Sequence, residues 1–301
     1  MKILVFGATG FVGGRLVPHL AARGHKVTVA ARSAAVFPGE VRTILADPMK
    51  PGAWSGAVEN SDAVVNLAGA PITLRWNRAN RKEILESRAT GTRNIVEAMR
   101  RGPAKTLLCA GATGYYGHGG DLVLTEASPR GQGFLSDVAA AWQDEAMRAE
   151  TFGHRVVIPR MGVVLGHGGM LARLRPFFSL GLGGRLGPGR QWFPWIHIQD
   201  LIRVIAFLLE NPEARGVFNA CAPAPVTNAE FTRTLSRILR RPALLPVPAP
   251  ILRLFMGEQA DLLLNSQRCI PTHLESMHFQ FTFPELRPAL ENLFLTSLLS
   301  G

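Results

Sequence analysis

Residues 2–13 read KILVFGATGFVG, an apolar run that ends in glycines at three-residue intervals. The next stretch, GGRLVPHLAARG at 13–24, has apolar residues at helical spacing and a final glycine, and HKVTVAAR at 25–32 is again rich in valine. Strand, helix and strand in this order are typical of the parallel crossover unit. The opening of the chain therefore predicts an α/β fold built on a parallel sheet.

The same pattern continues through the first half of the chain. The expected further elements are strands at 41–47, 62–70, 105–112 and 154–166, and helices at 83–102 and 134–150. These strands are apolar throughout, as strands covered on both faces are. We therefore expect a Rossmann, doubly wound parallel sheet.

Beyond about residue 165 the chain becomes rich in glycine and proline, with shorter helical stretches. This change predicts a smaller C-terminal substrate lobe beside the Rossmann domain. The expected boundaries are 1–165 for the Rossmann domain, re-entered at about 196–222, and 166–195 with 223–301 for the lobe.

Composition restricts the possible partners and location. The formal charge is +11, but the arginines are scattered and are not interleaved with aromatic residues, so no nucleic-acid surface is expected. A basic surface also suits a phosphorylated cofactor. We expect no membrane span and no signal peptide, because no run of eighteen apolar residues is present and glycines interrupt the first twenty residues.

The cysteines and the other metal-ligating residue types predict no special site. Cys109, Cys221 and Cys269 are odd in number and far apart, which favours reduced thiols over a disulfide framework. No group of histidine, cysteine and aspartate has metal-ligand spacing, so no metal is expected. We expect a cytoplasmic protein, and the sequence leaves its oligomeric state open.

The opening glycines have two possible roles. Gly7, Gly10 and Gly13 stand where a strand turns into a helix, and such a turn can be purely structural. In dinucleotide-binding folds, however, the first glycine permits the turn, the second lets backbone amides approach a pyrophosphate, and the third lets helix and strand pack closely. The surrounding strand, helix and strand favour a dinucleotide site.

The residue type at the end of the second strand indicates which dinucleotide is bound. An acidic residue there accepts hydrogen bonds from the adenosine ribose, whereas arginine accommodates a 2′-phosphate. The chain has Arg32 and Ser33 at this position and no acidic residue before Glu40. NADP(H) is therefore favoured over NAD(H), with an ordinary surface arginine as the alternative.

Several motifs together resemble one family over essentially the whole chain. They are GATGFVG at 7–13, NLAGAPI at 66–72, ESRATGT at 86–92, GATGYYG at 111–117, GLGGRLGPGRQWFPWIHIQDL at 181–201 and GEQADLLLNSQR at 257–268. The chain resembles the extended and atypical short-chain dehydrogenases/reductases, and within them the sugar-nucleotide-epimerase-like group, also labelled cell-division-inhibitor-like. The resemblance implies an NADP(H) site whose contacts are Gly7, Thr9, Gly10, Phe11, Val12, Gly13, Arg32, Ser33, Asp47, Leu67, Ala68 and Gly69.

The catalytic residues depart from the pattern of this family. Competent relatives carry a serine or threonine and a Tyr-x-x-x-Lys pair, in which the lysine favours ionisation of the tyrosine. The best-aligned positions for the pair are Phe134 and Val138, and Arg88 stands where an asparagine is common. The standard proton relay is therefore absent.

The chain has only two tyrosines, Tyr115 and Tyr116, in the loop after the fifth expected strand. Either can act as a substitute proton donor, together with Thr113, or can shape the cleft without taking part in chemistry. Tyr116 aligns better with the shaping residue of relatives, so Tyr115 is the candidate donor. His197 is a third candidate, with a structural histidine as the alternative.

A substrate cleft is expected at the carboxyl edge of the sheet. The residues expected to line it are Arg75, Trp76, Tyr116, Arg190, Trp192 and Trp195. Indoles and guanidinium groups favour a planar or anionic substrate. Alternatively, the tryptophans only fasten the smaller lobe.

Two classes of function stay open on this basis. One is an NADP(H)-dependent oxidoreductase or epimerase-like enzyme of unknown substrate with a nonstandard acid or base. The other is a non-catalytic NADP(H)-binding sensor or assembly protein, for which loss of the tyrosine and lysine is the main argument.

Overall fold

The computed structural model describes residues 1–295, which divide into two compact units. The sheet unit comprises Met1–Tyr115, Asp137–Arg160 and Ile202–Phe218. The lobe unit comprises Tyr116–Ser136, Met161–Leu201 and residues 219–295. A compact unit need not fold independently, so the domain boundaries expected from the sequence stay a prediction.

A large sheet in strand order β12-β8-β5-β4-β1-β2-β3, with β6 paired to β8, forms the centre of the sheet unit. Its strands are β1 (Lys2–Phe6), β2 (Lys26–Ala31), β3 (Arg42–Leu45), β4 (Ala63–Asn66), β5 (Thr106–Cys109), β6 (Gly111–Ala112), β8 (Arg155–Met161) and β12 (Gly216–Ala220). The pairings from β3 across to β8 are all parallel. The order reverses between β1 and β4, which is the doubly wound Rossmann arrangement and confirms the expected fold class.

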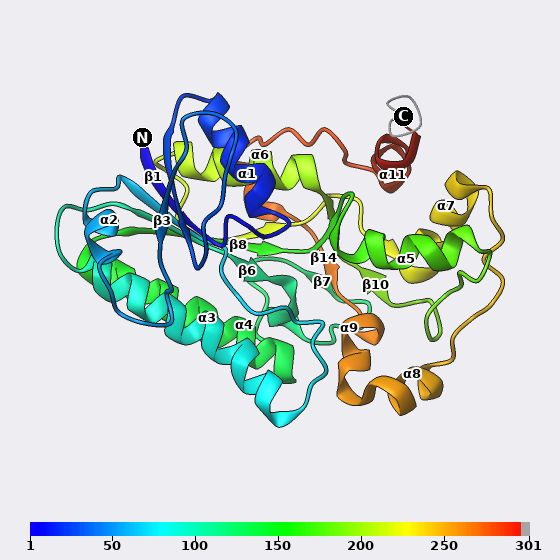
Figure 1. Ribbon diagram of the computed structural model, residues 1–301. Helices are drawn as coiled ribbons and strands as arrows, with labels where there is room; N and C mark the ends of the chain where they lie inside the picture. The colour runs from blue at the N-terminus through cyan, green and yellow to red at the C-terminus, as the bar shows by residue number, and fades with distance from the viewer. Residues whose placement is uncertain (296–301) are drawn as a thin grey trace. The chain divides into compact units, whose positions relative to one another are not determined.

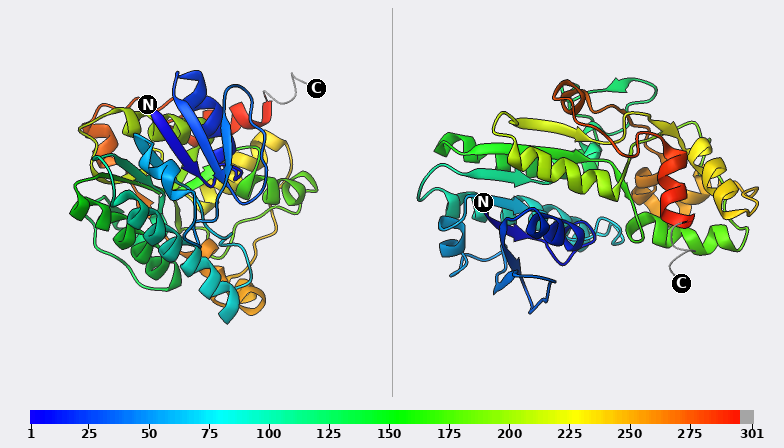
Figure 2. Two further views of the ribbon diagram at one scale, coloured as in Figure 1. Left: turned by 60° about the vertical axis from the view of Figure 1, so that its left-hand side comes forward. Right: turned by 90° about the horizontal axis from the view of Figure 1, so that it is seen from above.

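Helices cover both faces of this sheet (Figures 1 and 2). Figure 1 shows α3 and α4 side by side on one face and α1 and α6 on the other. The helices are α1 (Gly13–Ala22), α2 (Ser55–Glu59), α3 (Arg78–Met99), α4 (Phe134–Met147) and α6 (Ile198–Glu210), with short 3-10 turns η1 (Thr113–Tyr116) and η2 (Arg148–Phe152). Because both faces are covered, β4 is buried along its whole length.

Several elements differ in their bounds from those expected, and the strand expected at 105–112 divides into β5 and β6. The strand expected at 154–166 divides at Gly162 into β8 and β9 (Val163–Leu165), and β9 pairs with β11 (Trp195–His197) in a separate sheet. A side chain at Gly162 would lie 3.0 Å from the Pro194 carbonyl oxygen, a closer approach than most side chains make, so glycine suits this position. Helix α3 begins at Arg78 instead of residue 83, because the Asn77 side chain caps it by accepting the Asn80 N–H.

The lobe unit contains short strands and helices around its own core. Its elements are β7 (Val123–Leu124), β9, α5 (Gly169–Ser179), β10 (Trp192–Phe193), β11, β13 (Val226–Thr227), α7 (Asn228–Leu239), α8 (Ala249–Met256), η3 (Gly257–Ala260), α9 (Asp261–Leu264), β14 (Arg268–Cys269), α10 (Thr272–Ser276) and α11 (Leu286–Leu295). The core gathers apolar side chains of α5, α7, β11 and α11, among them Leu171, Trp195, Phe231 and Leu290. Between residues 1 and 295, no helix is both long and apolar enough to cross a membrane.

Candidate functional site

The glycine-rich loop between β1 and α1 is packed so tightly that two of its glycines have structural roles. Gly7 has φ +77°, and a side chain there would lie 2.6 Å from the Leu67 carbonyl carbon. A side chain at Gly13 would lie 2.6 Å from Ala8 Cα, where the helix packs against the loop. Gly10, in contrast, is exposed and has only the Gly7 oxygen near its missing side chain, at 3.3 Å. The middle glycine therefore leaves backbone accessible to a ligand.

The N-terminus of α1 is suited to an anion. Its N-cap residue, Val12, makes no side-chain capping bond, and the first turn has no acidic residue. The backbone N–H groups of the first turn therefore lack the usual side-chain acceptors, while Thr9 and Gly10 beside them are exposed. The N–H groups of Gly14 and Arg15 donate to the carbonyls of Gly10 and Val12, so the turn is closed by backbone bonds, and the positive end of the helix dipole favours an anion there.

A cavity of about 370 Å³ opens beside the end of β2. It is lined by Arg32, Leu45, Ala46, Asp47, Lys50, Pro51, Gly52, Ala53 and Trp54. Its floor is fixed, because the Met49 N–H donates to Asp47 Oδ1 at 3.0 Å and Trp54 Nε1 donates to the Lys50 carbonyl at 3.0 Å. Arg32 and Asp47 therefore line one cavity, and Lys50 adds a cation that the sequence analysis missed. Ser33, next to Arg32, is exposed.

The segment after β4 is held in place by hydrogen bonds from the buried Asn66 and the half-buried Ser87. Asn66 Oδ1 accepts the Ala68 N–H at 3.1 Å, and its amide donates to Thr92 Oγ1 at 2.8 Å. Ser87 Oγ accepts the Ala70 N–H at 2.9 Å. These bonds fix the backbone of Leu67, Ala68 and Gly69, while Gly69 itself stays exposed.

Arg88 is a half-buried cation, and its hydrogen bonds within residues 1–295 go to backbone carbonyls. Its guanidinium donates to the carbonyls of Ala70 and Ile84 at 3.0 and 3.1 Å, and lies 5.0 Å from the centre of the Trp142 ring. Burial lowers the pKa of Arg88 to about 10, so the side chain stays charged at neutral pH. It therefore places a positive charge beside the segment that follows β4.

The structure places Phe134 and Val138 on α4, the helix expected to carry the tyrosine and lysine pair. Phe134 is the first residue of the helix, and Val138 is buried. Neither side chain has a proton to exchange or a charge to contribute.

The candidate proton donor, Tyr115, is stacked on an arginine. The Arg160 guanidinium lies 3.5 Å from the centre of the Tyr115 ring, and its Nε and Nη2 donate to Gln143 Oε1 at 3.2 and 2.7 Å. Arg160 is buried, whereas Tyr115 is half-buried. The sequence signal for Arg160 is a charged residue inside the apolar run of β8, and our sequence analysis passed over it. Thr113, two residues before Tyr115, is buried.

Tyr116 has a different environment from its neighbour. It is buried, and its hydroxyl donates to Asn219 Oδ1 at 2.7 Å. Asn219 in turn donates to the carbonyls of Leu124 and Ile270. This network ties three segments of the lobe unit together, which fits the shaping role that we considered for Tyr116.

The expected cleft residues have different degrees of exposure. In the sheet unit, Arg75 is exposed, and the half-buried Trp76 donates its indole N–H to the Ile72 carbonyl at 2.9 Å. In the lobe unit, Arg190 is exposed, and the half-buried Trp192 lies under the Arg268 guanidinium at 4.5 Å.

Trp195 is only 1% exposed, and its indole N–H donates to the Ala224 carbonyl at 3.2 Å. Trp195 belongs to the core of the lobe unit, and this burial fits a structural role within that unit better than contact with a substrate.

His197 is buried, with its ring centre 4.0 Å from that of Phe283. Its Nδ1 accepts the Gln199 N–H at 3.1 Å. Burial lowers the pKa of His197 to about 4, against an opposing effect of Asp200, so the ring is neutral at pH 7. These contacts favour the structural reading of His197.

Comparison with known proteins identifies the family. The model of the NAD dependent epimerase/dehydratase family matches residues 3–221, and a domain of unknown function matches residues 247–293. The chain is 40% identical over 304 residues to the Epimerase family protein SDR39U1 homolog, chloroplastic, of Arabidopsis thaliana, covering 96% of this chain and 86% of the relative. It is 38% identical to Epimerase family protein SDR39U1 of Bos taurus over 302 residues, with 97% and 99% covered.

Solved structures agree with these matches. The crystal structure of human epimerase family protein SDR39U1 (isoform 2) with NADPH has a TM-score of 0.84 and 34% identity, covering 98% of this chain and 99% of that chain. MoeE5 in complex with UDP-glucuronic acid and NAD has a TM-score of 0.80 at 21% identity, a likeness of fold alone. The chain belongs to the NAD-dependent epimerase/dehydratase family, and its relatives and fold are those of an atypical short-chain dehydrogenase/reductase. This confirms the resemblance seen in the sequence.

Proposed function

We propose that this protein binds NADP(H) and acts as an epimerase-like oxidoreductase without the Tyr-x-x-x-Lys pair. The observation that carries the proposal is the cavity at the end of β2, because it presents Arg32 and Lys50 where the fold holds the adenosine of a dinucleotide. The NADPH in the structure of the human relative supports the same assignment.

Different residues of this chain would bind different parts of the cofactor. The exposed backbone at Thr9 and Gly10 and the N-terminus of α1 would hold the pyrophosphate, with Phe11, Val12 and Gly13 completing the turn. Arg32, Ser33 and Lys50 would hold the 2′-phosphate, and Asp47 would approach the adenine. Leu67, Ala68 and Gly69 would line the cofactor along β4. Bound NADPH supplies a hydride, and the protein must supply position and a proton.

The proposal is tested by calorimetric titration of NADPH and NADH into Arg32→Ala and Lys50→Ala variants. Each variant should lose affinity for NADPH but keep its affinity for NADH, because only NADPH carries the 2′-phosphate. Arg42→Ala is the matched control, since Arg42 is an exposed arginine of β3 that does not line the cavity. An Arg32→Ala variant with unchanged preference for NADPH would contradict the assignment.

We further propose that the protein turns over a substrate, with Tyr115 as proton donor. The support is the stacking of the half-buried Tyr115 on the buried Arg160, which keeps a positive charge against a phenol in the absence of the usual lysine. Thr113 would assist through its hydroxyl, and His197 is not included because its environment keeps it neutral and buried.

A non-catalytic NADP(H) sensor or assembly protein is the second candidate. The apolar Phe134 and Val138 on α4 favour it. The two functions differ in whether NADPH is consumed in the presence of a metabolite mixture. Location and oligomeric state stay predictions, and we keep the cytoplasm as the expected location.

A further inference from the structure

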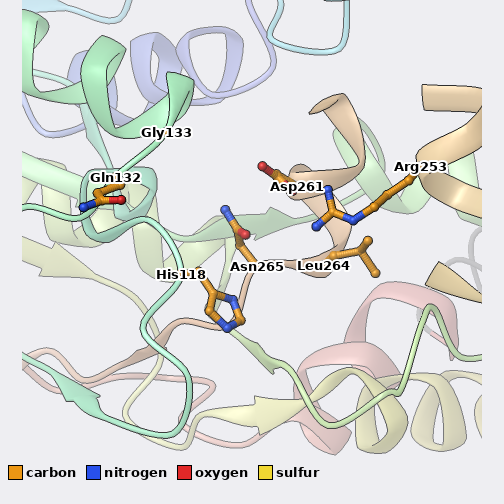
Figure 3. A pocket seen from close by; sticks show the side chains of 7 residues that line it. All are labelled: His118, Gln132, Gly133, Arg253, Asp261, Leu264 and Asn265. Carbon is orange, nitrogen blue, oxygen red and sulfur yellow. Dashed lines mark ion pairs between the residues drawn. The ribbon is translucent and has the colours of Figure 1, made fainter. Parts of the chain in front are cut away.

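A second cavity, of about 440 Å³, lies wholly within the lobe unit (Figure 3). It is lined by His118, Gln132, Gly133, Arg253, Asp261, Leu264 and Asn265, none of which the sequence analysis had assigned to a site. Its volume is within the range of small-molecule pockets, roughly 300–1,000 Å³. Leu264 is its one apolar side chain, so the cavity suits a polar ligand.

The wall that carries His118 is fixed by buried residues of the segment after α9. Ser266 accepts the Gly119 N–H at its carbonyl, at 2.8 Å, and donates its hydroxyl to the Gly120 carbonyl at 2.5 Å. Gln267 donates to the Gly117 carbonyl at 2.9 Å. Both Ser266 and Gln267 are buried. The backbone on either side of His118 is therefore fixed before a ligand binds.

A close backbone contact also fixes the loop that carries Gln132 and Gly133. Gly117 has φ +58°, and a side chain there would lie 2.7 Å from the Gln132 carbonyl oxygen. The loop that carries Gln132 and Gly133 therefore packs directly on the loop that carries His118.

His118 presents a hydrogen-bond donor. Its Nδ1 is 3.1 Å from the Ser266 backbone nitrogen. A backbone N–H can only donate, so Nδ1 accepts, and the neutral ring carries its hydrogen on Nε2. Figure 3 shows Asn265 between His118 and Asp261, with Arg253 reaching the same space from α8. The cavity is therefore lined by three hydrogen-bond donors: the His118 ring, the Asn265 amide and the Arg253 guanidinium.

Arg253 forms an ion pair with the Asp261 carboxylate in this cavity, and a ligand carboxylate can replace Asp261. Arg253 Nη1 is 3.2 Å from Asp261 Oδ1, and the two side chains are 57% and 33% exposed. Such exposed ion pairs contribute little to stability, so a ligand carboxylate can replace Asp261 on the guanidinium at small cost. The planar guanidinium matches a carboxylate geometrically.

We propose that this cavity binds a carboxylate group of the substrate, with Arg253 as the anion partner and His118 and Asn265 as further donors. As a statement about the substrate this rests on the proposed enzymatic function, but carboxylate binding itself is measured without nucleotide. A small hydroxy acid is the chemical class that fits the donors, and Asp261 acts as an internal competitor.

The experiment is titration of tartrate, inorganic phosphate and inositol into the nucleotide-free protein, followed by calorimetry or NMR. Tartrate should bind most tightly. Arg253→Gln should weaken tartrate binding roughly two- to fivefold, because an ion pair on a guanidinium this exposed contributes at most about 1 kcal/mol. Asp261→Asn should tighten it roughly two- to fivefold, since it removes the competitor. His118→Phe should weaken it by removing the Nε2–H donor.

The matched controls are Arg287→Gln and Glu291→Gln, an exposed ion pair of the same unit that does not line the cavity. Neither should change tartrate affinity. The proposal is overturned if tartrate does not bind, if Arg253→Gln leaves its affinity unchanged, or if phosphate or inositol binds more tightly. NADPH titration of the same samples tests the proposed function separately, because no lining residue of this cavity is among the proposed cofactor contacts.

Discussion

At the residue scale, the glycine-rich loop combines one glycine that packing requires with another that packing leaves free. A side chain at Gly13 would lie 2.6 Å from Ala8 Cα. A side chain at the neighbouring Gly14 would have the Ala8 oxygen as its nearest atom, at 3.8 Å. The two residues are consecutive in α1, so they form a matched pair.

Gly13→Ala should lower the free energy of unfolding by about 1–3 kcal/mol, the cost of forcing a methyl group into packed backbone. Gly14→Ala should leave stability unchanged or raise it by up to about 1 kcal/mol, because alanine favours a helix. Urea unfolding of both variants measures this. Equal effects of the two substitutions would show that the loop does not pack as described.

A second pair of substitutions distinguishes the roles of Tyr115 and Tyr116. Tyr116→Phe should destabilise the protein by about 1–3 kcal/mol, because it leaves the buried Asn219 oxygen without its hydrogen bond. Tyr115→Phe keeps the ring that stacks on Arg160 and should abolish any NADPH-dependent turnover. Thermal unfolding together with a turnover assay distinguishes them, and full activity in Tyr115→Phe would remove Tyr115 as proton donor.

The residue scale also shows where sequence reasoning stops. The glycines and Arg32 could be predicted from the sequence because they stand at the ends of strands that the local pattern already predicts. Tyr116 and Asn219 are 103 positions apart, and Arg160 reaches Tyr115 from a different strand. Such contacts depend on tertiary packing, which no local pattern encodes.

At the scale of elements, the strand and helix order of the sheet unit followed from apolar runs and turn residues. The division of the expected strand 154–166 at Gly162 did not, because an apolar run continues across the glycine. The reason for the division is the close approach of Pro194, a contact made by a distant segment. The start of α3 could have been read from its asparagine cap at Asn77.

Helix α4 carries Phe134 and Val138 at the positions where the family has its tyrosine and lysine. Installing the family pair by Phe134→Tyr and Val138→Lys should destabilise the helix packing by several kcal/mol without creating efficient reduction of simple ketones, because position 138 is buried. Phe134→Tyr alone is the control and should cost less, since Phe134 is half-buried. Efficient catalysis by the double variant, with unchanged stability, would show that the pair belongs at these positions and that only the side chains were missing.

At the scale of the whole molecule, the buried His197 makes stability depend on pH. Its folded pKa of about 4 lies below the ordinary value of 6.5, mainly because of burial. The unfolded chain therefore binds a proton between these values that the folded chain does not. Stability is fully present above pH 6.5 and is lost as pH falls toward 4, by about 2 kcal/mol at pH 5 from this residue alone.

Urea unfolding at pH 7.5 and pH 5 measures this loss. His197→Asn should make the difference between the two pH values smaller by a similar amount, whatever it does to stability itself. His278→Asn is the control, because His278 is exposed and its positive φ of 58° suits asparagine. An unchanged pH dependence in His197→Asn would place the acid sensitivity elsewhere, with the buried His154 as the next candidate, since burial also lowers its pKa.

We propose that this member of the epimerase family holds NADP(H) through the loop after β1 and the cations at the end of β2. Calorimetric titration of the unmodified protein with NADPH and with NADH decides whether it does. We expect NADPH to bind more tightly than NADH by about 1.5–3 kcal/mol, the contribution of hydrogen bonds to a charged group. This corresponds to a dissociation constant lower by roughly ten- to more than a hundredfold. Equal affinities for the two nucleotides, or no binding of NADPH, would contradict it.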